Sequence, residues 1–210
     1  MVNLILYYSS NLVPFLYGIY YYRELTKEIK ILIWFFLFVI LYEALAYYFM
    51  LRGNNLWMVH FYLPIEFGIW MIVISSWQKS KLLKKALIYI VPIYALFSII
   101  NSTYVERLTD FPSHSLSLEA IVLIGICVYT IFILSRDEES LVTSDGRFWI
   151  LFGRLFSSLT TLMMWPLSNL LKNMPDKFRL IYILFHLTAM IIANFLYAGG
   201  ILCQAKNLRS

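Results

Sequence analysis

The sequence predicts an all-α, polytopic membrane protein built as a bundle of seven transmembrane helices. Hydrophobic residues make up 61% of the 210 residues and charged residues only 14%, and the mean hydropathy is +0.73. So few polar side chains could not cover a water-soluble globule, so lipid must act as the solvent. Apolar runs of about 20 residues, the length that crosses about 30 Å of hydrocarbon, recur along the whole chain.

Seven such runs follow one another and leave no segment for a soluble domain, so residues 1–210 are predicted to form a single transmembrane domain. Helices are favoured over barrel strands because the runs are long and uniformly apolar, and a helix satisfies its own backbone polar groups within lipid. The first run lacks the basic start and the cleavage site of a secretory signal, and we expect it to be retained. The fourth run is short and contains Pro92, which makes it the weakest of the seven. The predicted spans are about 3–22, 30–51, 55–77, 86–101, 115–135, 148–171 and 178–203.

Basic residues at the ends of the runs predict the orientation of the chain. Eleven Lys and Arg residues fall on one side of the predicted spans and five on the other. Because Lys and Arg collect on the cytoplasmic side, we expect a protein of the cell membrane with its N-terminus outside and its C-terminus in the cytoplasm. The loop from Lys172 to Arg179 runs against this assignment. The formal charge of +5 does not indicate a nucleic-acid partner, because the basic residues form no stripe interleaved with aromatic side chains.

The spans are compatible with an internal repeat. If span 4 is a linker, spans 1 to 3 and 5 to 7 run in the same directions, which gives a 3+1+3 arrangement. Matching residues are few: spans 3 and 7 each carry one early histidine, His60 and His186. The sequence therefore leaves the repeat open.

Polar side chains within the spans define a candidate site. An ionisable residue at membrane depth is costly, so it marks either a function or an internal pair. With a rise of about 1.5 Å per residue, several such side chains lie at a similar depth below the outer boundary and could line one outward-facing cavity. For the histidines, a neutral imidazole bonded to a neighbouring tyrosine or carbonyl is the alternative. The candidate ligand or ion pocket consists of Asn11, Glu43, His60, Tyr62, Glu66, Glu119 and His186.

The deepest of these side chains has a predicted charged partner. Glu66 of span 3 and Arg154 of span 6 lie at depths that side chains can bridge, so an ion pair is expected. The pair could simply lock the two spans together. It could instead act as a gate or a proton site that breaks when the protein changes conformation.

Span 6 carries a continuous polar stripe on an otherwise apolar helix. Its members recur at intervals of four, three, four and three residues, which places them on one helical face. Small hydroxyl residues on such a face could serve close helix packing, and they could equally line a cavity or a conduction path. The stripe consists of Arg154, Ser158, Thr161, Trp165 and Ser168.

Familiar catalytic and metal-binding motifs are missing. The sequence has no His-Glu-x-x-His, no histidine pair four residues apart and no Cys-x-x-Cys. It also has no Gly-x-x-x-x-Gly-Lys and no Gly-x-Ser-x-Gly. We therefore predict no catalytic residue, no metal and no cofactor, and an enzyme is the minority hypothesis.

These observations favour a receptor-like or accessory seven-span protein that binds a small ligand from the outer side. With no output domain, it would have to act through a partner, and the basic segment 78–85 could contact an acidic protein or anionic lipid. One alternative is a small transporter or oligomeric channel that uses Glu66, Arg154 and the polar face of span 6. Another is a membrane-embedded enzyme. The lipid bilayer is the partner that composition demands, while a membrane or cytoplasmic protein partner and a homo-oligomer stay open.

Overall fold

The computed structural model describes residues 2–136, 141–164 and 175–207, and all regular secondary structure within these residues is helical. The predicted all-α class is therefore confirmed for them. Two short 3-10 turns, η1 (Tyr22–Glu24) and η2 (Val142–Ser144), precede α2 and α6. The long helices are α1 (Val2–Tyr20), α2 (Lys27–Leu51), α3 (Leu56–Ser76), α4 (Lys81–Tyr104), α5 (Ser113–Ser135), α6 (Gly146–Met164) and α8 (Asp176–Asn207).

Five of these helices are long and apolar enough to cross a membrane: α2, α3, α4, α5 and the 180–207 part of α8. Many of their large apolar side chains point away from the bundle, including Leu41, Phe61, Ile93 and Phe195. Such exposure would be unfavourable in water and suits contact with lipid. These helices indicate a membrane-embedded protein.

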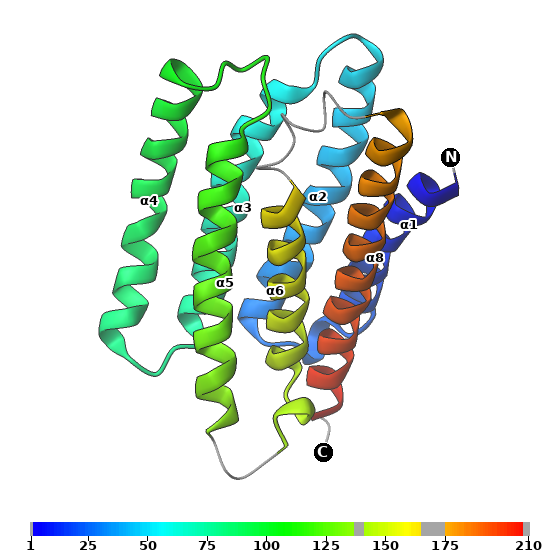
Figure 1. Ribbon diagram of the computed structural model, residues 1–210. Coiled ribbons are helices and arrows are strands. Elements are labelled where there is room, and N and C mark those ends of the chain that lie inside the picture. Colours follow the sequence, from blue (N-terminus) through cyan, green and yellow to red (C-terminus); the bar gives the residue numbers. More distant parts are fainter. Residues whose placement is uncertain (1, 137–140, 165–174, 208–210) are drawn as a thin grey trace.

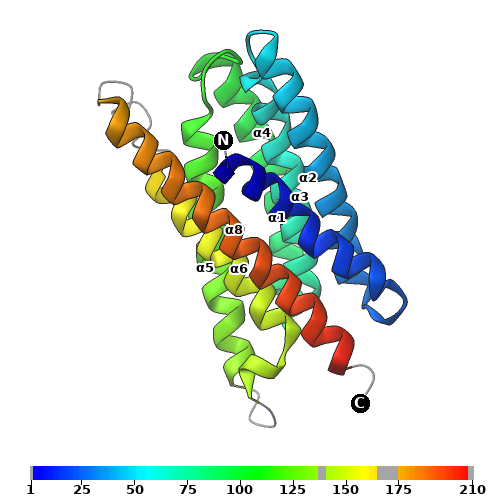
Figure 2. The ribbon, with the colours of Figure 1, turned by 90° about the vertical axis from the view of Figure 1, so that its right-hand side faces the viewer.

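The contacts among the described residues join six of the long helices into a closed ring. Helix α4 lies at one side of it (Figure 1). Around the ring, α1 packs on α2, α2 on α3, α3 on α5, α5 on α6, and α6 on α8, which returns to α1. Figure 2 shows α8 running between α1 and α6. Helix α4 packs on the outer side of α3 and α5.

The two ends of the bundle are distinguished by their connecting segments. We call the end that carries residues 52–55 and 105–112 the upper end, and the end that carries residues 21–26 and 77–80 the lower end, as drawn in Figure 1. The C-terminal end of α8 lies at the lower end. Gly53 in the upper turn between α2 and α3 has a φ of 128°, a backbone conformation that a glycine adopts without a steric penalty.

The apolar core fills the lower half of the ring. Ile29 and Ile33 from the first turns of α2 meet Met71 and Ile74 from the last turns of α3, and all four are fully buried. Ile150 near the start of α6 belongs to the same cluster. Tight apolar packing thus separates the space inside the upper half of the ring from the lower end of the bundle.

Helix α4 is longer than the predicted fourth span. It covers Lys81–Tyr104, 24 residues, and Pro92 lies inside it without ending it. The helix begins early because the Ser80 hydroxyl accepts a hydrogen bond from the Leu83 N–H, which caps its first turn. Apolar composition alone could not place this boundary, since the first five residues of the helix contain three lysines outside the apolar run.

Helices α6 and α8 approach each other at glycines. A Cβ atom added to Gly200 would lie 2.7 Å from the carbonyl oxygen of Gly146 and 2.6 Å from a side-chain carbon of Ile150. Further along α6, a Cβ on Gly153 would lie 2.9 Å from the ring of Tyr197. The absence of side chains at these glycines brings the two backbones together, as small residues do in membrane bundles.

Candidate functional site

A cavity of about 270 Å³ lies inside the ring, above the apolar core. All six helices of the ring contribute to its wall, whereas none of its lining residues comes from α4. Phe111, in the segment that joins α4 to α5, lines it at the upper end. The polar lining residues are Tyr7, Asn11, Tyr42, Glu43, Tyr62, Glu66, Glu119, Arg154, Ser157, Ser158, Thr161, His186, Asn194 and Tyr197.

The centre of the cavity wall is a three-residue charged cluster. Arg154 of α6 donates one hydrogen bond to Glu66 of α3 at 2.5 Å and another to Glu119 of α5 at 2.8 Å. The Glu119 side chain is 2% exposed, so its charge lies almost entirely away from solvent. One guanidinium thus joins three helices, and it can do so because its nitrogens are spread over a planar fork.

Aromatic rings hold the guanidinium from below. The Arg154 guanidinium carbon lies 5.1 Å from the centre of the Trp70 ring, within the range of a cation–π contact. Trp70 in turn packs against Phe35 and Tyr197, with ring centres 6.3 and 5.6 Å away. These rings form the floor of the cavity, where it meets the apolar core.

A third carboxyl group faces the cavity from α2. Glu43 accepts a hydrogen bond of 2.7 Å from the hydroxyl of Tyr7 in α1. Beside it, the rings of Tyr42 and Tyr62 stack with their centres 4.2 Å apart. The wall formed by α2 and α3 therefore combines one carboxyl group with the rings of two tyrosines.

Helices α1 and α8 are joined by an amide contact at the cavity edge. The Asn194 amide donates to the side-chain oxygens of Asn11, at 2.6 Å, and of Ser10, at 2.9 Å. Both asparagines are buried. These bonds tie α8 back to α1 and complete the ring on the side opposite α3 and α5.

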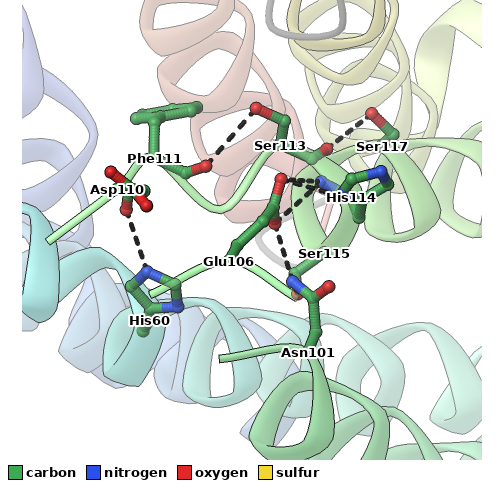
Figure 3. Close-up of polar contacts among 9 residues, drawn as sticks. All are labelled: His60, Asn101, Glu106, Asp110, Phe111, Ser113, His114, Ser115 and Ser117. Atoms are coloured by element: carbon green, nitrogen blue, oxygen red, sulfur yellow. Dashed lines mark hydrogen bonds and ion pairs between the residues drawn. The ribbon is translucent and has the colours of Figure 1, made fainter. Parts of the chain in front are cut away.

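The segment that carries Phe111 is anchored to the helices around it (Figure 3). His60 of α3 makes a 3.0 Å hydrogen bond through Nε2 with the carbonyl oxygen of Asp110. Glu106 accepts from the backbone N–H of His114 at the start of α5, and from the amide of Asn101 in α4. A carboxylate at a helix N-terminus satisfies free N–H groups and complements the helix dipole. This anchored segment forms part of the roof over the cavity.

The structure places six of the seven predicted pocket residues on the cavity wall: Asn11, Glu43, Tyr62, Glu66, Glu119 and His186. His60 does not line it, which corrects the prediction for this residue. It is 5% exposed and its imidazole bonds the Asp110 carbonyl, as in the alternative that the sequence left open for the histidines. Depth alone could not separate the two roles, because His60 and Glu66 point in different directions from α3.

The polar face of α6 also lies at the cavity. Arg154, Ser158 and Thr161 all line it, and so does Ser157, whose hydroxyl lies 3.3 Å from that of Tyr197. Trp165 and Ser168, the other predicted members of the stripe, lie outside the described residues, as does the 165–171 part of the predicted sixth span.

Sequence reasoning missed two features of the site. It paired Arg154 with Glu66 but did not bring Glu119 to the same guanidinium, because Glu119 begins much nearer the upper end of its helix. It also passed over Asn194, although a lone amide in the last apolar run was a usable signal. Among the described residues, no group of three or more His, Cys, Asp and Glu side chains is placed to hold a metal ion.

A wider hollow of about 660 Å³ lies at the lower end. Thr26, Trp77, Asp145 and Gln204 are among its lining residues, and Arg147 pairs there with Asp145 at 2.6 Å. Both side chains of this pair are partly exposed. We take the upper cavity as the candidate site because it contains the buried charges, which are the costly feature of the bundle.

Comparisons with protein-family models, with curated proteins and with solved structures gave no match. Functional inference for this chain therefore starts from the geometry of the cavity.

Proposed function

We propose that this protein is a receptor-like, seven-span membrane protein that binds a small ligand in the upper cavity and acts through a partner. The observation that carries the proposal is the cavity itself, which combines buried charges, aromatic walls and a packed floor. Small-molecule sites are typically concave and largely apolar, with a few converging polar groups. A void of this kind costs packing energy, and a ligand that fills it recovers that energy.

The proposal includes the membrane topology. All seven helices cross the bilayer, with α4 as the odd member of a 3+1+3 arrangement, because α1 and α6 pack within the same ring as the five more apolar helices. The N-terminus and the upper end face the outside. Lys79, Lys81, Lys84 and Lys85 then lie on the cytoplasmic side at the lower end, as expected from the distribution of basic residues.

The partner would contact the lower end. The lysine-rich start of α4 offers positive charge to an acidic protein or to anionic lipid head groups. The lower hollow adds a concave surface between the ends of α2, α3, α6 and α8. A change in the cavity would reach this surface through helices that line both.

Native mass spectrometry of the protein purified from membranes tests whether the cavity holds a small molecule. We expect a retained compound in the wild type and its loss in Ser158→Phe, because Ser158 is 3% exposed and lines the cavity. Leu159→Phe is the matched control, since the neighbouring Leu159 is 43% exposed on the outer side of α6. Equal retention in both variants would place the compound elsewhere and overturn the proposal.

A transporter is the second candidate, favoured by the charged cluster that links three helices. Buried charge pairs of this kind occur on substrate and ion pathways in membranes. Uptake assays with proteoliposomes separate the two functions. Accumulation of the retained compound inside the vesicles would identify a transporter, whereas binding without accumulation supports the receptor-like function.

A further inference from the structure

We infer that the ligand of the upper cavity is a small organic ammonium ion that also carries an oxygen acceptor. The inference rests on the proposed function and names the chemical class that the same site would take. Three observations carry it: the balance of charged groups on the wall, the aromatic rings beside the Glu43 carboxyl group, and buried polar groups that lack a partner within the described part of the chain.

The cavity wall carries more negative than positive groups. Among the described residues that line it are three carboxyl groups, those of Glu43, Glu66 and Glu119, against one guanidinium, that of Arg154. If His186 also carried a proton, one carboxylate would still be uncompensated. Because an unpaired charge in a low-dielectric interior is costly, the balance favours a ligand that brings positive charge.

The geometry shows where that charge belongs. Arg154 is already engaged by Glu66 and Glu119, whereas Glu43 accepts from Tyr7, a neutral donor. Glu43 is therefore the carboxyl group without a cationic partner among the described residues. An ammonium group beside Glu43 would pair with its carboxylate and balance the remaining negative charge of the cavity wall.

The adjacent walls suit an organic cation. Tyr42, Tyr62 and Phe111 line the cavity, and because Tyr62 stacks with both Tyr42 and Phe38, the side of the Tyr42 ring turned away from Tyr62 and the ring of Phe111 are the surfaces that a cation could meet. Aromatic faces attract ammonium groups through their quadrupole. Arg154 over Trp70 is an example of the same interaction within this cavity.

Two further lining groups call for a ligand acceptor. The indole N–H of Trp70 and the hydroxyl of Ser158 have no hydrogen-bond partner among the described residues, and the two residues are 1% and 3% exposed. A buried donor without an acceptor is costly. An ammonium group cannot accept a hydrogen bond, so the ligand needs an oxygen as well. A void of about 150 Å³ admits benzene, so the larger cavity of about 270 Å³ admits a substituted ring.

Three probes that share a phenyl ring and a hydroxyl group and differ in charge test the inference: 2-amino-1-phenylethanol, 1-phenylethane-1,2-diol and mandelate. Binding is measured by isothermal titration calorimetry at neutral pH on the full chain in phosphatidylcholine nanodiscs. We expect the amine to bind at least about tenfold more tightly than the diol, which corresponds to about 1.4 kcal/mol, and mandelate to bind most weakly.

Variants tie the preference to the cavity. Glu43→Gln should weaken the amine about tenfold and leave the diol unchanged, and its diol affinity shows that the fold is intact. Glu28→Gln, the same change at the lower end of α2, is the control and should alter neither. Equal weakening of the amine by both variants would overturn the assignment to Glu43.

The outcomes separate this inference from the proposed function. If the diol or mandelate binds as tightly as the amine, the cation class is overturned while a ligand cavity stands. If none of the three binds, both the ligand cavity and its preference for cations are overturned.

Discussion

Arg154 is the residue on which the interior of the bundle depends most. Its guanidinium contacts carboxylates from α3 and α5 and the ring of Trp70, so one side chain of α6 touches the adjacent helix α5 and also α3, which is not next to α6 in the ring. The gain from such a buried pair is offset by the cost of taking the charges out of water. Removing Arg154 alone should nevertheless destabilise the bundle, because the carboxylates would remain buried without their partner.

Arg154→Gln should lower the free energy of unfolding by about 3–5 kcal/mol, because Glu66 and Glu119 would be left unpaired. The measurement is thermal unfolding in detergent, monitored by tryptophan fluorescence. Adding Glu66→Gln and Glu119→Gln should restore much of the stability, since the uncompensated charges are then removed.

Arg147→Gln provides the matched control for this change. Its pair with Asp145 is partly exposed at the lower end, with side-chain exposures of 36% and 24%, so the expected cost is at most about 1 kcal/mol. Equal melting temperatures for Arg154→Gln and Arg147→Gln would show that the buried cluster has no special structural role.

His60 should control the mobility of the roof. His60→Phe removes the hydrogen bond to the Asp110 carbonyl, a loss of about 0.5–1.5 kcal/mol, so hydrogen exchange at the amides of residues 105–111 should rise about twofold to tenfold. Asn54→Ala, at the other upper-end turn, removes a bond to the Leu56 N–H and should leave these amides unchanged. Unaltered exchange in His60→Phe would mean that other contacts hold the segment.

Prediction at the residue scale succeeded where the depth of two side chains in the membrane decides whether they meet. It failed where the direction in which a side chain points decides its partner. Glu66 and Arg154 could be matched because helical rise gives their depths, and the structure brings them together. The second partner, Glu119, depends on how far the Arg154 side chain reaches, which depth does not give. His60 lies on a different face of α3 from Glu66, and only the neighbouring chain segment decides what it meets.

At the scale of elements, the contact between α6 and α8 depends on glycines. Gly200 faces the backbone of Gly146, so the two helices touch without intervening side chains. Its neighbour Gly199 has no atom within 4 Å of an added Cβ. Alanine substitutions at these two adjacent glycines therefore separate the effect of helix packing on stability from the effect of intrinsic helix preference.

Gly200→Ala should destabilise the bundle by about 1–3 kcal/mol, because the new methyl group would overlap Ile150 and the Gly146 carbonyl. Gly199→Ala should leave stability unchanged or raise it by up to about 1 kcal/mol, since alanine favours helix. Melting temperatures of the two variants in the same detergent check this. A Gly200→Ala protein as stable as Gly199→Ala would show that the helices can separate at little cost.

Apolar run length predicted the helices well and their ends less well. The predicted 55–77 and 115–135 differ from α3 and α5 by one or two residues, because both runs end near turn-forming polar residues. The predicted 86–101 fell short of α4, whose capped, lysine-containing first turn is helical but not apolar. Composition reports where lipid contacts the chain, whereas hydrogen bonds decide where a helix begins.

At the scale of the whole molecule, α4 lies outside the ring and contributes none of the described residues that line the cavity, although its Tyr94 hydroxyl bonds Glu119 from behind the wall. The sequence singled out span 4 as the odd member by counting alone, and the structure places α4 outside the other six helices. The packing order around the ring could not be predicted, because it depends on which helix faces meet. In particular, the contact of α8 with α1 joins segments at opposite ends of the sequence.

Single-cysteine labelling should reveal the orientation of the bundle. In a Cys203→Ser background, where Cys127 is fully buried, a membrane-impermeant maleimide should label Asn54→Cys in intact cells and Ser80→Cys only after permeabilisation. Both positions are exposed, at the upper and lower ends respectively. Labelling of Ser80→Cys in intact cells would reverse the proposed orientation, against the distribution of lysine and arginine.

If a ligand in the cavity displaced α6, the close glycine contact between α6 and α8 would be the point about which the helices tilt. Gly146 and Thr161 lie 15 residues apart on α6, a distance of about 22 Å along the axis. If an occupant moved the α6 wall outward by about 1 Å at Thr161, the helix would tilt by about 3° around its fixed end. The last seven residues of α8 extend about 10 Å beyond Gly200, so a matching tilt of α8 would swing its tail by about half as much in the opposite direction. Through the contact of the two backbones, a small displacement of α6 at the cavity would thereby move the C-terminal end of α8 at the lower end of the bundle.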